Sequence, residues 1–172
     1  KLAFEFIVLT ASRSGEARLA TWAEFNLDAM EWLVPASRMK AKRDHRVPLS
    51  GRVLEILAEA QSLSDGGDLV FAGTKQGKPL SDMTLSKLIK ELGFEADVHG
   101  FRTSFKTWVQ ERTNFAREVS EMALAHVIQN KAEAAYARSD LLDKRRMMME
   151  SWARYLATKS QDVVYIGRSG AK

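Results

Sequence analysis

Apolar residues at the start of the chain recur with the spacing of a helix. They are Leu2, Phe6, Ile7 and Leu9. The small and polar residues of Thr10–Gly15 indicate a turn that ends this helix. Residues 16–22 then predict a second, short helix.

Two short apolar stretches predict a small antiparallel sheet. Trp32–Val34 and Arg46–Leu49 have the composition of strands, and a strongly basic connection separates them. This pattern predicts a hairpin or meander with Lys40–Arg43 near its tip. A further short strand is expected at Leu69–Phe71, after a loop that contains two consecutive glycines.

The rest of the pattern predicts helices. Ser50 and Ser81 each precede an apolar series with helical spacing, as N-cap residues do. From His99 onward the chain is expected to be almost wholly helical, with a long final helix around Leu141–Leu156. The predicted fold class is therefore α+β, mainly α, with one small antiparallel sheet and no internal linker.

Length, composition and charge narrow the class of protein. The 172 residues suit one globular domain, and the proportions of hydrophobic (45%) and charged (28%) residues exclude disordered, collagenous and membrane classes. Without cysteine there are no disulfides and no thiolate metal sites. The net charge of +4, with basic clusters at residues 40–43 and 144–146, fits a polyanionic partner and a solvated basic surface equally well.

Several polar side chains are hard to explain by folding alone. His99 and Arg102 lie three residues apart at an expected helix start, where an imidazole, a guanidinium and the helix N-terminus form a donor site for an anion. Capping of the helix by His99 is the alternative for this pair taken alone. The other members of the set are Arg13, Lys40, His126 and Tyr136.

The order and neighbours of these residues are more informative than any one of them. In chain order the blocks are Thr10–Glu16, the basic turn with Lys40, His99-Gly-Phe-Arg102, Leu124-Ala-His126 and Ala135-Tyr136-Ala-Arg138. This series resembles the catalytic domain of tyrosine recombinases of the phage integrase family. Residues 39–49 and 145–152 resemble prophage integrases in particular. The resemblance covers nearly the whole chain and implies the DNA breaking-rejoining enzyme fold.

The resemblance implies a role for each residue of the set. The catalytic residues are Arg13, Lys40, His99, Arg102, His126 and Tyr136, with Glu16 as a supporting acid and Lys42 and Arg43 as DNA-binding residues. Tyr136 is the nucleophile, His99 the better candidate for its base, and Lys40 the donor of a proton to the departing 5′ oxygen. His45 is expected to have a structural or backbone-contacting role.

Two positions depart from the pattern that the family implies. The family's Thr-Gly-x-Arg is Thr-Ala-Ser-Arg here, so Ala11 stands at the glycine position. Its Leu-Gly-His is Leu-Ala-His, so Ala125 stands at the second glycine position. Each departure adds one methyl group.

The implied function is site-specific DNA recombination for integration or excision of a prophage or genomic island. The tyrosine forms a 3′-phosphotyrosine and releases a 5′-hydroxyl, and a second DNA end reverses the step without ATP. Because the sequence holds no Walker-type loop, no HExxH and no obvious carboxylate cluster, no cofactor or metal is expected. A type IB topoisomerase-like enzyme and a non-catalytic DNA-binding module stay open as alternatives.

The resemblance also implies partners and a domain context. We expect double-stranded DNA attachment sites as partners, a homotetramer in the synapse, a monomer for the isolated domain, and no membrane. Residues 1–172 are expected to be the C-terminal catalytic domain without its N-terminal DNA-binding domains, with 157–172 as a flexible tail. A cytoplasmic, nucleoid-associated location in a bacterium is expected. The apolar residues of the final helix, among them Tyr155 and Leu156, are expected in the core, with a possible second role in docking on a neighbouring protomer.

Overall fold

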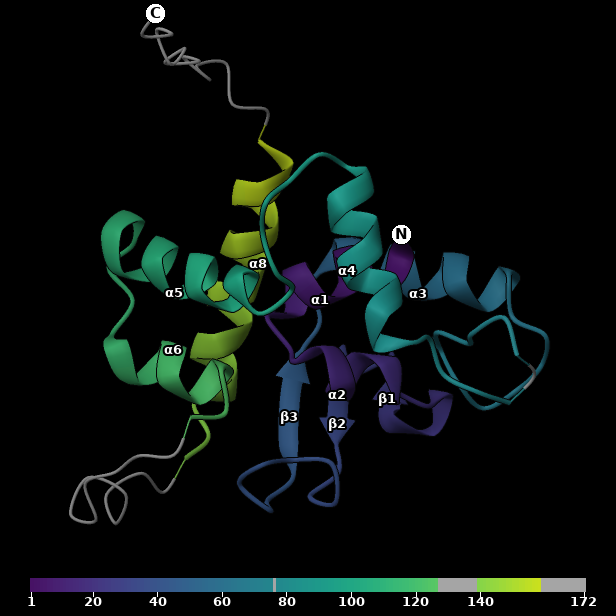
Figure 1. The fold of residues 1–172 in the computed structure, drawn as a ribbon. Coiled ribbons are helices and arrows are strands. Elements are labelled where there is room, and N and C mark those ends of the chain that lie inside the picture. Colours follow the sequence, from purple (N-terminus) through teal and green to yellow (C-terminus); the bar gives the residue numbers. More distant parts are fainter. Residues whose placement is uncertain (76, 127–138, 159–172) are drawn as a thin grey trace, which may run out of the picture.

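The computed structural model describes residues 1–75, 77–126 and 139–158. Within these ranges helices surround the central α1, and a three-stranded sheet lies at one end (Figure 1). The predicted fold class is confirmed. The elements are α1 (Leu2–Thr10), α2 (Ser14–Arg18), η1 (Trp22–Glu24), β1 (Phe25–Asn26), β2 (Glu31–Val34), β3 (His45–Pro48), α3 (Gly51–Ser62), α4 (Asp82–Glu91), α5 (Gly100–Arg112), α6 (Arg117–Ala123) and α8 (Leu142–Ala157).

The helix α1 lies between two groups of elements, which explains why most of its surface is apolar. One core cluster joins α1 to the sheet and to α3, and its centre is Phe6, whose ring lies 5.2 Å from the ring of Trp32. The second cluster packs α5 and α6 against α8. The indole of Trp152 donates a hydrogen bond to the carbonyl oxygen of Val8 (2.9 Å), which ties α8 to α1.

The sheet is an antiparallel meander in the order β1-β2-β3. Trp32 of β2 is the partner of Val47 in β3, and both side chains are buried against the first cluster. The two strands predicted on either side of the basic connection are confirmed as β2 and β3, and β1 adds a short third strand. The connection between β2 and β3 carries Lys40, as predicted.

Two local predictions are wrong. The second helix does not cover residues 16–22: α2 begins earlier, where the carboxylate of Glu16 accepts the backbone N–H of Arg13, and η1 follows as a separate turn. Residues 69–71 form no strand, because Leu69 pairs only with Thr21, in an isolated bridge.

The helix termini agree with the predictions in part. The Ser81 hydroxyl caps α4 by accepting the backbone N–H of Met83 (3.3 Å). Ser50 holds the N-cap position of α3, but its buried hydroxyl has no hydrogen-bond partner among the described residues. The final helix is confirmed as α8, whereas the expectation of a core position for Tyr155 and Leu156 is wrong, since they are 50% and 40% exposed. They lie in the last turn of α8, beyond the buried cluster around Trp152.

The predicted tail begins at the last residue of α8, and residues 159–172 lie outside the described residues. None of the helices in the described ranges is both long and apolar enough to cross a membrane.

Candidate active site

The first site residue stands at the start of α2. Ala11 has a left-handed backbone (φ 49°), which ends α1 and redirects the chain toward Arg13, the N-cap of α2. Buried Glu16 accepts both the backbone N–H of Arg13 (2.8 Å) and its guanidinium (2.7 Å). The structure therefore places Glu16 where it orients Arg13, although its role in catalysis stays a prediction.

Arg102 lies under the surface, in the first turn of α5. Its guanidinium donates to the carbonyl oxygens of Ala11 and Leu124, the latter at 2.7 Å. It thereby joins the turn before Arg13 to the end of α6. Burial and the charge of nearby Arg13 lower its pKa to about 10, while Glu16 acts in the opposite sense. The guanidinium is therefore still charged at neutral pH.

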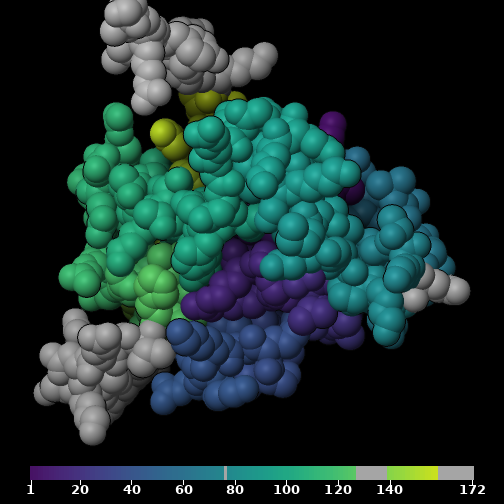
Figure 2. Space-filling view, viewed as in Figure 1, coloured from purple at the N-terminus to yellow at the C-terminus, as the bar shows by residue number. Residues whose placement is uncertain are grey.

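An open cleft of about 520 Å³ lies where α2, the β2–β3 connection and the start of α5 meet. In Figure 2 the purple N-terminal part is visible between the blue residues of the sheet region and the teal region that leads to α5. The charged and imidazole side chains that line the cleft are Arg13, Glu16, Arg38, Lys40, Lys42 and His99.

The cleft brings together three of the predicted catalytic residues, namely Arg13, Lys40 and His99. The imidazole of His99 makes no capping bond to α5 and is exposed, so the capping alternative is not what the structure shows. Arg102 is buried and is not among the lining residues, so His99 and Arg102 differ in exposure. Lys42 lines the cleft, whereas Arg43 is exposed outside the set of lining residues.

The described lining of the cleft is strongly cationic. It holds four Arg or Lys side chains against one carboxylate, Glu16, which is already bonded to Arg13. Such a surface attracts an anion with several oxygens, and guanidinium groups match phosphate oxygens in particular. Within the described ranges no group of His, Asp or Glu is arranged to hold a metal ion.

Sequence reasoning missed Arg38. It lines the cleft and bonds to the carboxylate of Glu24 and to the carbonyl oxygen of Glu16 (3.4 Å). The sequence signal was its place two residues before Lys40, in the same basic connection. Its carboxylate partner belongs to η1, which no local pattern links to this position.

His126 follows α6 and is exposed. Its Nδ1 atom lies 2.5 Å from the carboxylate of Glu121, whose other oxygen lies 2.7 Å from the ammonium of Lys106. Partial burial opposes ionisation of Glu121, but the hydrogen bonds from Lys106 and His126 outweigh it and hold the pKa of this carboxyl below its usual value. An ionised Glu121 thus orients the imidazole. His126 is not among the residues that line the cleft.

Ala11 and Ala125 share an unusual backbone conformation. Both have φ of 49°, in the left-handed region, and they immediately precede Ser12 and His126. These are the two positions where the family pattern has glycine, which adopts this conformation without the steric cost that a Cβ atom adds. For an L-residue that cost is roughly 1–2 kcal/mol.

Of the three tyrosines of the chain, only Tyr155 lies within the described residues. Tyr136 and Tyr165 lie outside the described residues. The ring of Tyr155 lies 5.6 Å from the ring of Trp108 and 5.7 Å from that of Trp152. Its side chain therefore belongs to the aromatic cluster of α5 and α8 and is not part of the cleft lining.

A mainly helical domain with a small sheet and a cationic cleft at the β2–β3 connection fits the class of DNA breaking-rejoining tyrosine recombinases. The sequence pattern described as "Phage integrase family" matches residues 1–142. The chain therefore belongs to the phage integrase family. It is 40% identical over 153 residues to prophage integrase IntA of Escherichia coli, covering 87% of this chain and 37% of that protein. This chain thus spans less than half the length of that relative.

Solved structures share the fold. The integrase from mycobacterium phage Brujita superposes with a TM-score of 0.64 at 19% identity, over 87% of this chain and 51% of that one. The XerH site-specific recombinase, in a pre-cleavage complex with its difH substrate, gives a TM-score of 0.51 at 23% identity, over 79% and 45%. The expected fold is thus confirmed.

Proposed function

We propose that this chain cuts and rejoins DNA strands as the catalytic domain of a site-specific recombinase that integrates or excises a prophage or genomic island. The observation that carries the proposal is the cleft in which Arg13, Lys40 and His99 converge, together with the buried Arg102 that bonds to Ala11 in the turn before Arg13, in a chain of the phage integrase family. Tyr136 is the proposed nucleophile, on the resemblance of its sequence neighbours alone.

The arginines have the chemistry that attack on a phosphodiester requires. Negative charge builds up on the non-bridging oxygens in the transition state, and fixed donors there stabilise it. Glu16 holds the guanidinium of Arg13 at the cleft. The guanidinium of Arg102 donates two hydrogen bonds, to the carbonyl oxygens of Ala11 and Leu124. A guanidinium has five N–H groups, so three of them are not used by these two bonds.

We assign the proton transfers to exposed groups. A phenol with an ordinary pKa of about 10 must lose its proton during attack, and we assign that proton to His99, which is exposed at the cleft. Lys40, exposed in the β2–β3 connection, donates a proton to the departing 5′ oxygen. His126, oriented by Glu121, supplies a further hydrogen bond to the phosphate.

The proposed reaction requires neither metal nor ATP. Attack of the tyrosine oxygen breaks the bond between phosphorus and the 5′ oxygen and forms a 3′-phosphotyrosine, and a 5′-hydroxyl then breaks that bond in turn. Two phosphoesters are exchanged, so no external energy is needed. The proposed substrate is double-stranded DNA, which binds to the cationic cleft. In the synapse, four copies of the protein assemble as a homotetramer. The DNA complex of XerH supports the choice of DNA as partner.

Strand transfer tests the function. Radiolabelled duplexes that span the two ends of the genetic element carrying this gene are incubated with the chain in a buffer with EDTA and without ATP. Recombinant junctions are the expected product. A parallel incubation uses a supercoiled plasmid, and relaxation of this plasmid without recombinant junctions from the duplexes indicates a topoisomerase-like activity instead. Binding to DNA without any strand cleavage indicates a non-catalytic DNA-binding module.

A further inference from the structure

The basic cluster at residues 144–146 is only partly at the surface, since Lys144 is exposed, Arg146 is half-buried and Arg145 is buried. Arg145 is one of the most buried side chains of the described residues, at 1% exposure. Arg146 donates to the carboxylate of Glu31 (3.1 Å) and to the carbonyl oxygen of Met30 (3.3 Å). Arg145 and Arg146 therefore both contact residues in or beside the sheet, and the alternative of a solvated basic surface is wrong for the buried Arg145.

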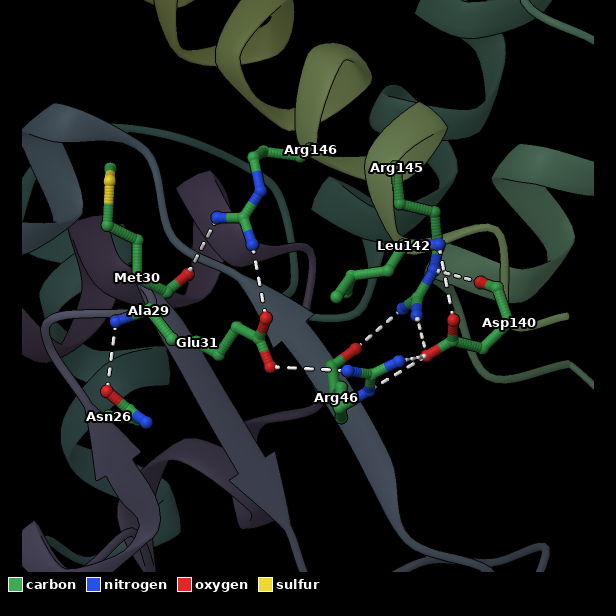
Figure 3. A network of polar contacts seen from close by, with 9 residues as sticks. All are labelled: Asn26, Ala29, Met30, Glu31, Arg46, Asp140, Leu142, Arg145 and Arg146. Carbon is green, nitrogen blue, oxygen red and sulfur yellow. Dashed lines mark hydrogen bonds and ion pairs between the residues drawn. The ribbon is translucent and has the colours of Figure 1, made fainter.

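These contacts centre on Asp140, which precedes α8. One carboxylate oxygen of Asp140 accepts two N–H groups of Arg46 (2.7 and 3.0 Å) and one of Arg145 (3.0 Å). The other accepts the backbone N–H of Leu142 (3.3 Å). Figure 3 shows Arg46 between Glu31 of β2 and Asp140, with the side chains of α8 reaching the same group.

Arg145 closes the network from the buried side. It donates to the backbone oxygen of Asp140 (2.7 Å) and to that of Arg46 (2.6 Å). Both the main chain and the side chain of Asp140 are therefore fixed to the start of β3.

The residue next to Arg46 makes a second long-range contact. The Nε2 atom of His45 lies 3.2 Å from the carbonyl oxygen of Ala123, the last residue of α6. Successive residues of a strand point to opposite faces, so His45 and Arg46 reach two different segments from one place. His45 contacts Ala123, at the end of α6, and Arg46 contacts Asp140, just before α8.

The stretch between these two anchors contains, by sequence, His126 and the proposed nucleophile Tyr136. On the other side of His45, the β2–β3 connection ends at residue 44, and Lys40 lies only five residues before His45. A chain of four residues spans at most about 14 Å, so an anchored Asp140 limits how far Tyr136 can lie from β3.

We propose that His45 and Arg46 are positioning residues, which fasten both flanks of the segment carrying His126 and Tyr136 to the strand that follows Lys40. This inference rests on the proposed recombinase function. The start of β3 thereby sets the distance between the group that donates a proton to the leaving oxygen and the segment that carries the nucleophile. Misplacement of reacting groups by about 1 Å can slow a reaction about a hundredfold.

The exposed pair of Arg46 and Asp140 is better suited to positioning the segment than to stabilising the fold. The side chains of Arg46 and Asp140 are 45% and 42% exposed, and exposed pairs of this kind contribute little to the stability of a fold. Loss of the pair is therefore expected to affect the rate of chemistry more than the melting temperature. Arg145 is unsuitable for this test because its side chain is buried, and its removal takes a donor from the carbonyl oxygens of Asp140 and Arg46, which threatens the fold.

The experiment begins with a set of nicked suicide duplexes that together cover the DNA flanking the gene. The duplex on which the unmodified chain forms a covalent adduct is then used as the substrate for all variants. The rate constant of capture is measured at saturating DNA for Arg46→Ala, Asp140→Asn and the double variant, together with the DNA dissociation constant and melting temperature. Arg52→Ala is the matched control, because Arg52 is also an exposed arginine (44%) that binds a carboxylate, Glu5, through two nitrogens.

The proposal predicts that both single variants slow capture by about ten- to a hundredfold with unchanged DNA affinity. The melting temperature is unchanged for Arg46→Ala, whereas Asp140→Asn lowers it, because Asp140 is also the carboxylate partner of the buried Arg145. The double variant is no slower than the slower single one, since Arg46 acts through its contact with Asp140. Arg52→Ala captures DNA at the rate of the unmodified chain. Weaker DNA binding by Arg46→Ala, with normal capture by Asp140→Asn, overturns the proposal and makes Arg46 a phosphate contact.

His45 supplies a second arm. His45→Gln keeps an N–H donor close to the Nε2 position and is expected to retain capture, whereas His45→Ala loses the bond to Ala123 and captures more slowly. Equal capture rates for all variants overturn the inference while leaving the function intact. If the unmodified chain forms no adduct on any duplex of the tiled set, the proposed function itself fails, and the inference with it.

Discussion

Acidification is expected to destabilise the fold through His45. Burial, and next the charge of Arg145, lower the pKa of this imidazole from 6.5 to about 4, with Arg102 acting in the same sense. The carbonyl of Ala123 and the carboxylate of Glu16 act in the opposite sense but are weaker. The neutral imidazole is therefore the form that the folded protein holds at neutral pH.

The sign and size follow from linkage. Between the two pKa values the unfolded chain binds more protons than the folded protein, so the free energy of unfolding falls as pH falls through this window. With pKa values of 6.5 and about 4, the loss between pH 7 and pH 5 is about 2 kcal/mol. The carboxyls of Glu121 and Asp140, whose pKa values are lowered, titrate mostly below this window and contribute little to it.

Urea unfolding at pH 7 and pH 5 tests this prediction on the unmodified chain and on His45→Gln. Glutamine does not titrate, so the variant is expected to lose about 2 kcal/mol less on acidification than the unmodified chain. The comparison cancels the titration of all other groups. An equal loss in both proteins would refute the reasoning, since it would mean that His45 has no depressed pKa.

Four measurements probe the site further. Arg102→Met removes the donor of the Ala11 and Leu124 carbonyls, so the unfolding free energy is expected to fall by about 1–3 kcal/mol for each carbonyl left unpaired; a variant as stable in urea as the unmodified chain contradicts this. Ala125→Gly relieves a left-handed alanine and is expected to stabilise the chain by about 1 kcal/mol; destabilisation in urea shows that the methyl group packs favourably. Lys40→Ala is expected to slow cleavage by a factor of about a hundred to ten thousand, with near-normal rates restored on a substrate carrying sulfur at the 5′ bridging position; failure of sulfur to rescue assigns Lys40 to phosphate positioning instead. DNA binding, followed by fluorescence anisotropy, is expected to weaken steeply with added salt because phosphate contacts release counterions; salt-independent binding contradicts the cationic interface.

The sequence predicts the elements whose signal is local. Periodicity predicts α1 and α8, and two apolar stretches around the basic connection predict β2 and β3. The isolated bridge at Leu69 has no such signal, because its single partner, Thr21, lies 48 positions earlier, and a three-residue apolar run is compatible with several structures. The early start of α2 depends on the side chain of Glu16, which propensity does not show.

The site is predictable in a different way. Convergence of Arg13, Lys40 and His99 on one cleft agrees with the family resemblance, and the glycine positions of the family coincide with the left-handed residues Ala11 and Ala125. The contacts of Arg46 with Asp140 join positions 94 apart. No periodicity in the sequence predicts such a pair. The sequence alone does not distinguish Arg46 from any other surface arginine.

The most direct test of the account is to locate the covalent bond to DNA. The chain is trapped on a nicked suicide duplex, the adduct is digested with protease and nuclease, and the nucleotide-bearing peptide is sequenced by mass spectrometry. We expect a phosphotyrosine at Tyr136, and we expect Tyr136→Phe to bind the duplex with normal affinity but to form no adduct. An adduct on Tyr155 or Tyr165, or one that persists in Tyr136→Phe, contradicts the assignment of the nucleophile.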